Sequence, residues 1–190
     1  MLDLTEFDAW WARWYPAAEP IAWSLREAYP DRWLRLHSLP ESKRYPETSA
    51  EVSEVLFRYD ALATRVLGRG APCLMLGYDW GVNDLKAAGN EIAQLGEARD
   101  TRLTVLPADE YRESPLAVFG TEVVWHPGEF DTLLLAIADD RATSLWVAIE
   151  SGAVFAPYDG GVDLIHPTTL ERDFHRLHFA SWRSTRDDGL

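Results

Sequence analysis

Residues 154–166, "VFAPYDGGVDLIH", decide the fold, because two apolar runs flank an Asp-Gly-Gly turn signal. Glycine adopts positive φ angles without a Cβ clash, so the pattern predicts a hairpin with a two-residue loop at Gly160 and Gly161. In that register, Tyr158 would lie opposite Asp163. The segment therefore predicts two adjacent antiparallel strands.

Similar short apolar runs, separated by turn signals, precede the hairpin. Their close spacing favours antiparallel hairpins over parallel βαβ units. The predicted strands are RWLRLHS (32–38), APCLMLGYDW (71–80), LTVLP (103–107), TEVVWHP (121–127), TLLLAIA (132–138) and SLWVAIES (144–151).

Helical periodicity marks the rest of the chain. Thr-x-x-Glu capping boxes at Thr48 and Thr168 predict a long helix that ends near Gly68 and a C-terminal helix that runs to about Trp182. An apolar stripe predicts a helix before Pro16, with a core role favoured over a ligand platform, although the stripe could also pack on a second chain. The stripe consists of Phe7, Trp10, Trp11 and Trp14.

These elements predict an α+β fold, with a mainly antiparallel meander sheet and helices packed on one face. We expect one domain over residues 1–190, in which residues 1–30 form a helical element and residues 31–190 the α+β core. The segment 81–102 is ambiguous, because it fits either a short helix or an excursion of the chain.

The net charge of −13 disfavours binding to nucleic acid and favours a basic protein partner. Eight acids and one base, Arg112, lie within residues 109–140, a pattern typical of a solvated face. The N-terminus does not resemble a signal peptide, and no apolar run is long enough to span a membrane, so we expect a cytoplasmic protein. The sequence leaves the oligomeric state open.

We predict no metal and no cofactor. The single cysteine, Cys73, lies in an apolar run and has no partner for a disulfide or a Cys-based zinc site. The turn at residues 159–163 resembles the start of a calcium loop, but Leu164 and Leu170 occupy the positions that require Gly and a bidentate acid. His37, His126 and His166 each follow a predicted strand and could form a cluster, although isolated surface histidines are favoured.

Three segments carry a family resemblance: HSLPESKRYPET (37–48), LLLAIADDR (133–141) and FAPYDGGVDLIHPTTLERDF (155–174). Together they resemble an uncharacterised family of bacterial domains of unknown function over residues 33–190. The resemblance implies that both loops are family features, and it implies no activity.

We expect the two loops to lie close together, with Lys43 or Arg44 paired to Asp159 or Asp163. The candidate functional site consists of His37, Lys43, Arg44, Tyr158, Asp159 and Asp163. The favoured function is a non-enzymatic interaction protein, similar to an immunity protein or antitoxin, that binds a basic partner through an acidic surface. The alternative is a hydrolase-like or small-molecule-binding enzyme with its site between these loops.

Overall fold

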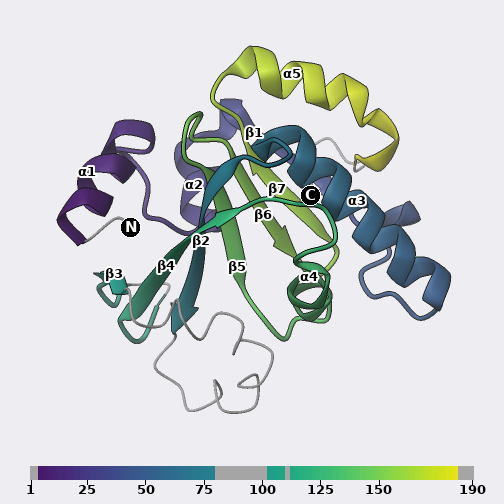
Figure 1. Cartoon of the computed structure of the whole chain (residues 1–190), viewed down its shortest axis with the longest axis horizontal. Helices are drawn as coiled ribbons and strands as arrows, with labels where there is room; N and C mark the ends of the chain where they lie inside the picture. The colour runs from purple at the N-terminus through teal and green to yellow at the C-terminus, as the bar shows by residue number, and fades with distance from the viewer. Residues whose placement is uncertain (1–3, 80–101, 110–111, 184–190) are drawn as a thin grey trace.

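The structure is a computed structural model that describes residues 4–79, 102–109 and 112–183 (Figure 1). Within those residues it contains five α-helices and a seven-stranded antiparallel sheet, which confirms the α+β class. The predicted segment 81–102 lies outside the described residues, except for Arg102. The helices are α1 (Leu4–Trp14), α2 (Ala22–Ala28), α3 (Ser49–Leu67), α4 (Asp131–Ala138) and α5 (Thr169–His178). The strands are β1 (Trp33–His37), β2 (Pro72–Asp79), β3 (Arg102–Leu106), β4 (Leu116–Val124), β5 (Ser144–Ala148), β6 (Val154–Tyr158) and β7 (Gly161–Ile165).

The strand order is β1-β7-β6-β5-β2-β4-β3. Strands β5, β6 and β7 form the predicted meander, and β2 joins it beside β5. Strand β1 returns to one edge and pairs with β7, from Trp33 opposite Ile165 to His37 opposite Gly161. The segment after β1 therefore meets the β6–β7 turn.

Helices cover both faces of the sheet, so the prediction of helices on one face is wrong. In β5, Trp146 packs into the core that contains residues of α3 and α4, whereas Leu145 and Val147 pack into the core that contains residues of α1 and α2. The physical reason is that the central strands are apolar at both alternating sets of positions, and each set requires a cover. Figure 1 shows α3 and α4 on one side of the sheet and α2 on the other.

The run TLLLAIA forms α4 and not the predicted strand. Its buried residues Leu134, Ile137 and Ala138 follow helical spacing and pack against the α3 side of the sheet. Because a seven-residue apolar run fits both periods, its length alone could not distinguish a helix from a strand.

The β6–β7 turn differs from the prediction by one residue. Tyr158 pairs with Gly161, so the loop consists of Asp159 and Gly160, and Asp163 lies opposite Ala156. Gly160 has a φ of +116°, but Gly161 does not adopt positive φ. Gly161 is required for another reason, since a Cβ atom there would lie 2.4 Å from the Leu36 carbonyl oxygen of β1.

The aromatic residues of α1 pack on their own chain. Phe7 and Trp11 are buried in the core beneath α1 and α2, which confirms the predicted core role for the stripe. The Trp11 indole N–H donates to the Ala18 carbonyl (2.8 Å), and the Tyr15 hydroxyl donates to the Gly152 carbonyl. The N-terminal helix is thus fixed to the sheet by burial and by hydrogen bonds.

Candidate functional site

The two family-like loops lie together, as predicted. Arg44 Nε lies 2.5 Å from Asp159 Oδ2, and the Tyr45 hydroxyl donates to the same carboxylate oxygen (2.8 Å). We call this contact between residues 38–47 and residues 158–161 the loop junction. One carboxylate at the tip of a hairpin thereby orders the segment that joins β1 to α3.

Backbone groups fix the loop junction from both sides. The Ser38 N–H donates to the Gly160 carbonyl (3.0 Å), which extends the β1–β7 pairing into the turn. From α3, the buried Tyr59 hydroxyl donates to the Tyr158 carbonyl (2.7 Å). The turn is therefore clamped between an edge strand and the longest helix.

Backbone strain is concentrated near the junction. Within the described parts of the chain, three residues other than glycine adopt positive φ: Glu41 (56°), Ser42 (59°) and Asp140 (57°). Two belong to the first loop, where the Ser42 hydroxyl lies 3.1 Å from His37 Nε2. The third lies near Arg44, whose pKa is raised by the hydrogen bond to Asp159 and further by the charge of Asp140. Strain of this kind is more frequent at functional surfaces than elsewhere.

Lys43 has a structural role within the first loop of the junction. Its Nζ lies 3.0 Å from Glu47 and 2.6 Å from Glu51, so the expected pairing with Asp159 or Asp163 is wrong for this residue. The Lys43 hydrogen bond lowers the pKa of Glu51 to about 2, helped by the backbone N–H of Glu47. Since Glu51 also accepts from the Thr48 N–H in the capping box, Lys43 reinforces the start of α3.

Asp163 binds Arg35 and not Arg44. The reason is strand register, because Arg35 of β1 lies directly opposite Asp163 of β7. The contact is bidentate, with Arg35 Nε and Nη2 donating to the two carboxylate oxygens at 2.8 and 2.9 Å. The Trp33 indole N–H donates to Oδ1 (2.8 Å), and Arg26 of α2 lies 4.0 Å away. This buried carboxylate joins the sheet edge to α2.

Tyr158 and His37 lie on the fringe of that ion pair. The Arg35 guanidinium lies 4.8 Å from the centre of the Tyr158 ring, and burial raises the pKa of the Tyr158 hydroxyl. Burial also lowers the pKa of His37, and the positive charges of Arg35 and Arg58 act in the same direction. The six predicted residues thus separate into a solvent-facing contact, Arg44 with Asp159, and supporting groups around it.

The residues that the junction presents to solvent are an exposed Arg44, an exposed Tyr45 and a border of acidic side chains. Asp139 and Asp140 are both exposed, directly after α4. Such a surface can recognise cationic groups by charge and an apolar or planar group by its tyrosine.

Comparison with known protein families gives one match, "Domain of unknown function (DUF3885)", over residues 21–187. The chain belongs to this family. The match includes both loops of the junction and begins after α1. No curated protein and no solved structure shows significant similarity to the chain. Membership in the family therefore assigns no activity.

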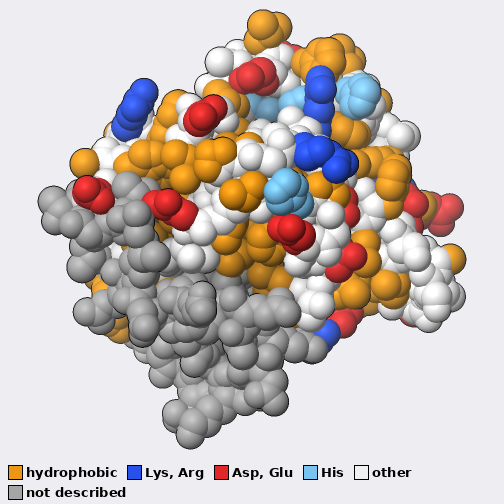
Figure 2. All heavy atoms as spheres, viewed as in Figure 1, with side chains coloured by type: hydrophobic (Ala, Val, Ile, Leu, Met, Phe, Trp, Pro, Cys, Tyr) orange, Lys and Arg blue, Asp and Glu red, His pale blue; other side chains and the backbone are white. Residues whose placement is uncertain are grey.

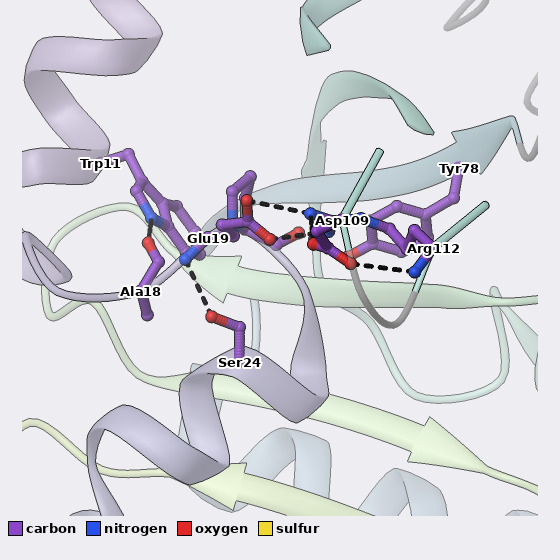
Figure 3. A network of polar contacts seen from close by, with 8 residues as sticks. Trp11, Ala18, Glu19, Ser24, Tyr78, Asp109 and Arg112 are labelled. Carbon is purple, nitrogen blue, oxygen red and sulfur yellow. Dashed lines mark hydrogen bonds and ion pairs between the residues drawn. The ribbon is translucent and has the colours of Figure 1, made fainter. Parts of the chain in front are cut away.

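This member of the family contains a partly buried polar network that the sequence did not predict (Figure 3). Arg112, the lone base of the acidic segment, is buried and binds Glu19 through two N–H groups at 2.6 and 3.1 Å. It also contacts the Asp109 carboxylate, while the Glu19 N–H donates to the Ser24 hydroxyl (3.0 Å). The network ties the α1–α2 connection to the segment before β4. The isolated base among acids was its only signal in the sequence.

A second network joins two histidines of this family member. His166 Nε2 lies 2.8 Å from His175 Nδ1, His166 Nδ1 lies 3.1 Å from the Arg32 carbonyl, and Arg65 Nε donates to His175 Nε2 (3.1 Å). The Arg32 carbonyl only accepts, so His166 Nδ1 carries the proton. Arg65 only donates, so His175 Nε2 accepts and His175 Nδ1 donates to His166 Nε2. Both rings are therefore neutral.

The possible cluster of His37, His126 and His166 does not form, because antiparallel pairing places His37 and His166 at opposite ends of β1 and β7. The favoured expectation of isolated surface histidines is wrong for His166, which is buried and contacts His175. Among the residues that the structure describes, no three His, Cys, Asp or Glu side chains are arranged to hold one metal ion. In the same residues, no helix is both long enough and apolar enough to cross a membrane.

Proposed function

We propose that this family member is a protein-binding module, similar to an immunity protein or antitoxin, and that the loop junction and its acidic border contact a basic partner. The observation that carries the proposal is an exposed Tyr45 in a pair of loops held by specific contacts, with Asp140 close enough for its charge to act on Arg44 and Tyr45. The neighbouring Asp139 is also exposed and pairs with Arg141. Tyrosine is frequent among residues that dominate binding energy, and complementary charge accelerates association.

The net charge of −13 supports this proposal. Most acids of the segment 109–140 are exposed, including Glu113, Glu122 and Glu129. A field of this sign attracts cationic surfaces at a distance and repels nucleic acid. The junction would then supply the specific contact within a broadly acidic surface.

The enzyme alternative requires six side chains to converge: His37, Lys43, Arg44, Tyr158, Asp159 and Asp163. Asp163 instead binds Arg35 at the sheet edge near α2, whereas Arg44 binds Asp159 at the turn tip. Because Asp163 is committed to a structural ion pair, this arrangement favours the binding module.

The test uses the tagged full-length chain as bait in an extract of its source cells. The junction variant combines Tyr45→Ala, Asp139→Asn and Asp140→Asn, and asparagine is chosen because it tolerates the positive φ at residue 140. The control variant, Glu113→Gln with Glu122→Gln, removes the same amount of charge elsewhere. We expect a basic protein to bind the unmodified chain and the control, and to bind the junction variant at least about tenfold more weakly.

The proposal fails if no basic protein is recovered, or if the partner binds the junction variant and the control equally well. A second assay tests the finer assignment as an immunity protein or antitoxin. Expression of the partner alone should arrest growth, and co-expression of this chain, but not of the junction variant, should restore it.

A further inference from the structure

Helix α5 is amphipathic, but its apolar stripe faces solvent, whereas the apolar stripe of a surface helix usually faces the core. Leu170, Phe174 and Leu177 lie on one stripe of the helix and are exposed by 77%, 51% and 79%. The side chain that α5 buries against the body is His175, and Phe179 follows at the end of the helix. Figure 2 shows hydrophobic side chains along the upper edge of the molecule, where Figure 1 places α5.

This orientation is fixed and not an accident of a loosely attached helix. His175 is held between His166 and Arg65, and the Phe179 ring stacks on Trp182 at 5.0 Å. The exposed Leu170 and Leu177, at positions i and i+7, belong to neither of the two core clusters. An exposed apolar stripe bordered by polar residues is typical of an interface.

The charges along α5 indicate what covers the stripe. Glu171 and Asp173 occupy its N-terminal half, whereas Arg176 and His178 occupy its C-terminal half, and all four are exposed. On a helical projection, Asp173 borders one side of the stripe, and Glu171 and His178 border the other. Arg176 lies beyond Asp173, farther from the stripe, where only the length of its side chain brings its charge to that flank. A two-fold axis through the middle of α5 would place each acid beside a base of an antiparallel copy.

We infer that α5 forms an isologous, antiparallel dimer contact with α5 of a second copy of this chain. Leu170 of one copy packs beside Leu177 of the other, and the two Phe174 rings meet near the axis. Asp173 pairs with Arg176 of the second copy on one flank, and Glu171 pairs with His178 on the other. One helix pair is a small interface, so association is weak, in the micromolar range.

Sedimentation equilibrium of the full chain tests the contact. We expect a monomer–dimer equilibrium that Leu177→Glu shifts at least about tenfold toward monomer. The control Val124→Glu changes a residue on β4 that is also exposed, by 47%, and it should leave the equilibrium unchanged. Circular dichroism establishes that each variant keeps its fold.

A charge exchange tests the orientation. In the variant Asp173→Arg, positions 173 and 176 are both basic, so two copies of the variant repel each other at this contact. In the variant Arg176→Asp, both positions are acidic, and two copies again repel each other. Each should self-associate more weakly than the unmodified chain, while an equimolar mixture should form a heterodimer as tight as the original dimer. A parallel or unrelated contact would not give this recovery.

The inference is overturned if the unmodified chain stays monomeric up to about 1 mM, or if the mixture shows no heterodimer. It is also overturned if Leu177→Glu leaves the dimer intact. A monomer that binds vesicles of anionic lipid through α5 would identify a membrane as the occupant instead. This surface lies apart from the loop junction, so neither result affects the proposed partner-binding function.

Discussion

At the scale of single residues, Asp163 is a carboxylate enclosed by donors from Arg35, Trp33 and Arg26. We expect Asp163→Asn to lower the free energy of unfolding by about 3 kcal/mol, because it leaves the partly buried Arg35 guanidinium without a counter-charge. Urea denaturation at pH 7 measures the change. The control Glu113→Gln removes an exposed acid and should change stability by less than about 0.5 kcal/mol. Equal stability of both variants would contradict the assignment of Asp163 to the fold.

His166 makes stability dependent on pH. Burial lowers its pKa from the usual 6.5 to about 4, and the positive charge of Arg172 acts in the same direction. Between pH 6.5 and pH 4, His166 is therefore protonated in the unfolded chain but not in the folded chain. The free energy of unfolding has its full value above pH 6.5 and falls as the pH decreases toward 4. The shift corresponds to a loss of about 3 kcal/mol.

Thermal denaturation between pH 7 and pH 4 checks this expectation. His166→Gln should flatten part of the profile, while the lowered pKa values of His37 and His175 keep a remainder. A profile that His166→Gln leaves unchanged would show that the ring is not the group that titrates.

At the scale of elements, the β6–β7 hairpin depends on two glycines for different reasons. We expect Gly161→Ala to destabilise the chain by about 1–3 kcal/mol, because the new Cβ would collide with the Leu36 carbonyl of the neighbouring strand. The matched control is Gly77→Ala in β2, where no atom lies within 4 Å of the added Cβ. A loss of stability that is equal at both sites would point to strand propensity and not to the close approach of β1.

Elements with local signals could be predicted from the sequence, and so could the contact of Arg44 with Asp159, whereas contacts that depend on strand register could not. The capping box at Thr48 fixed the start of α3, because both halves of the motif lie within four residues. The apolar run that forms α4 fits both the helical and the strand period, so its secondary structure depends on the elements that pack against it. The partner of Asp163 depends on which strand lies beside β7, and that strand lies more than a hundred residues earlier in the chain. Charge alone favoured Arg44 as the partner of Asp163, but the β1–β7 register places Arg35 opposite Asp163.

At the scale of the whole molecule, we expect α1 to belong to the same cooperative unit as the sheet, although the family match begins after it. Phe7→Ala should cost about 3–5 kcal/mol, because its ring is fully enclosed in the core that α1 and α2 cover. Urea unfolding followed by tryptophan fluorescence and by far-UV circular dichroism should shift as one transition. The control is Asp8→Asn on the exposed side of α1. Two separate transitions would show that α1 folds independently.

The pairing of β1 with β7 also sets the order of events during synthesis. Strand β1 emerges from the ribosome early, but β7 follows it by more than a hundred residues. At typical elongation rates, about 5–20 residues per second, β1 waits on the order of ten seconds with its edge unpaired. During that interval its Trp33, Leu34 and Leu36 side chains are available to other nascent chains. We therefore expect a chaperone that binds short apolar segments to shield this strand until β7 is synthesised.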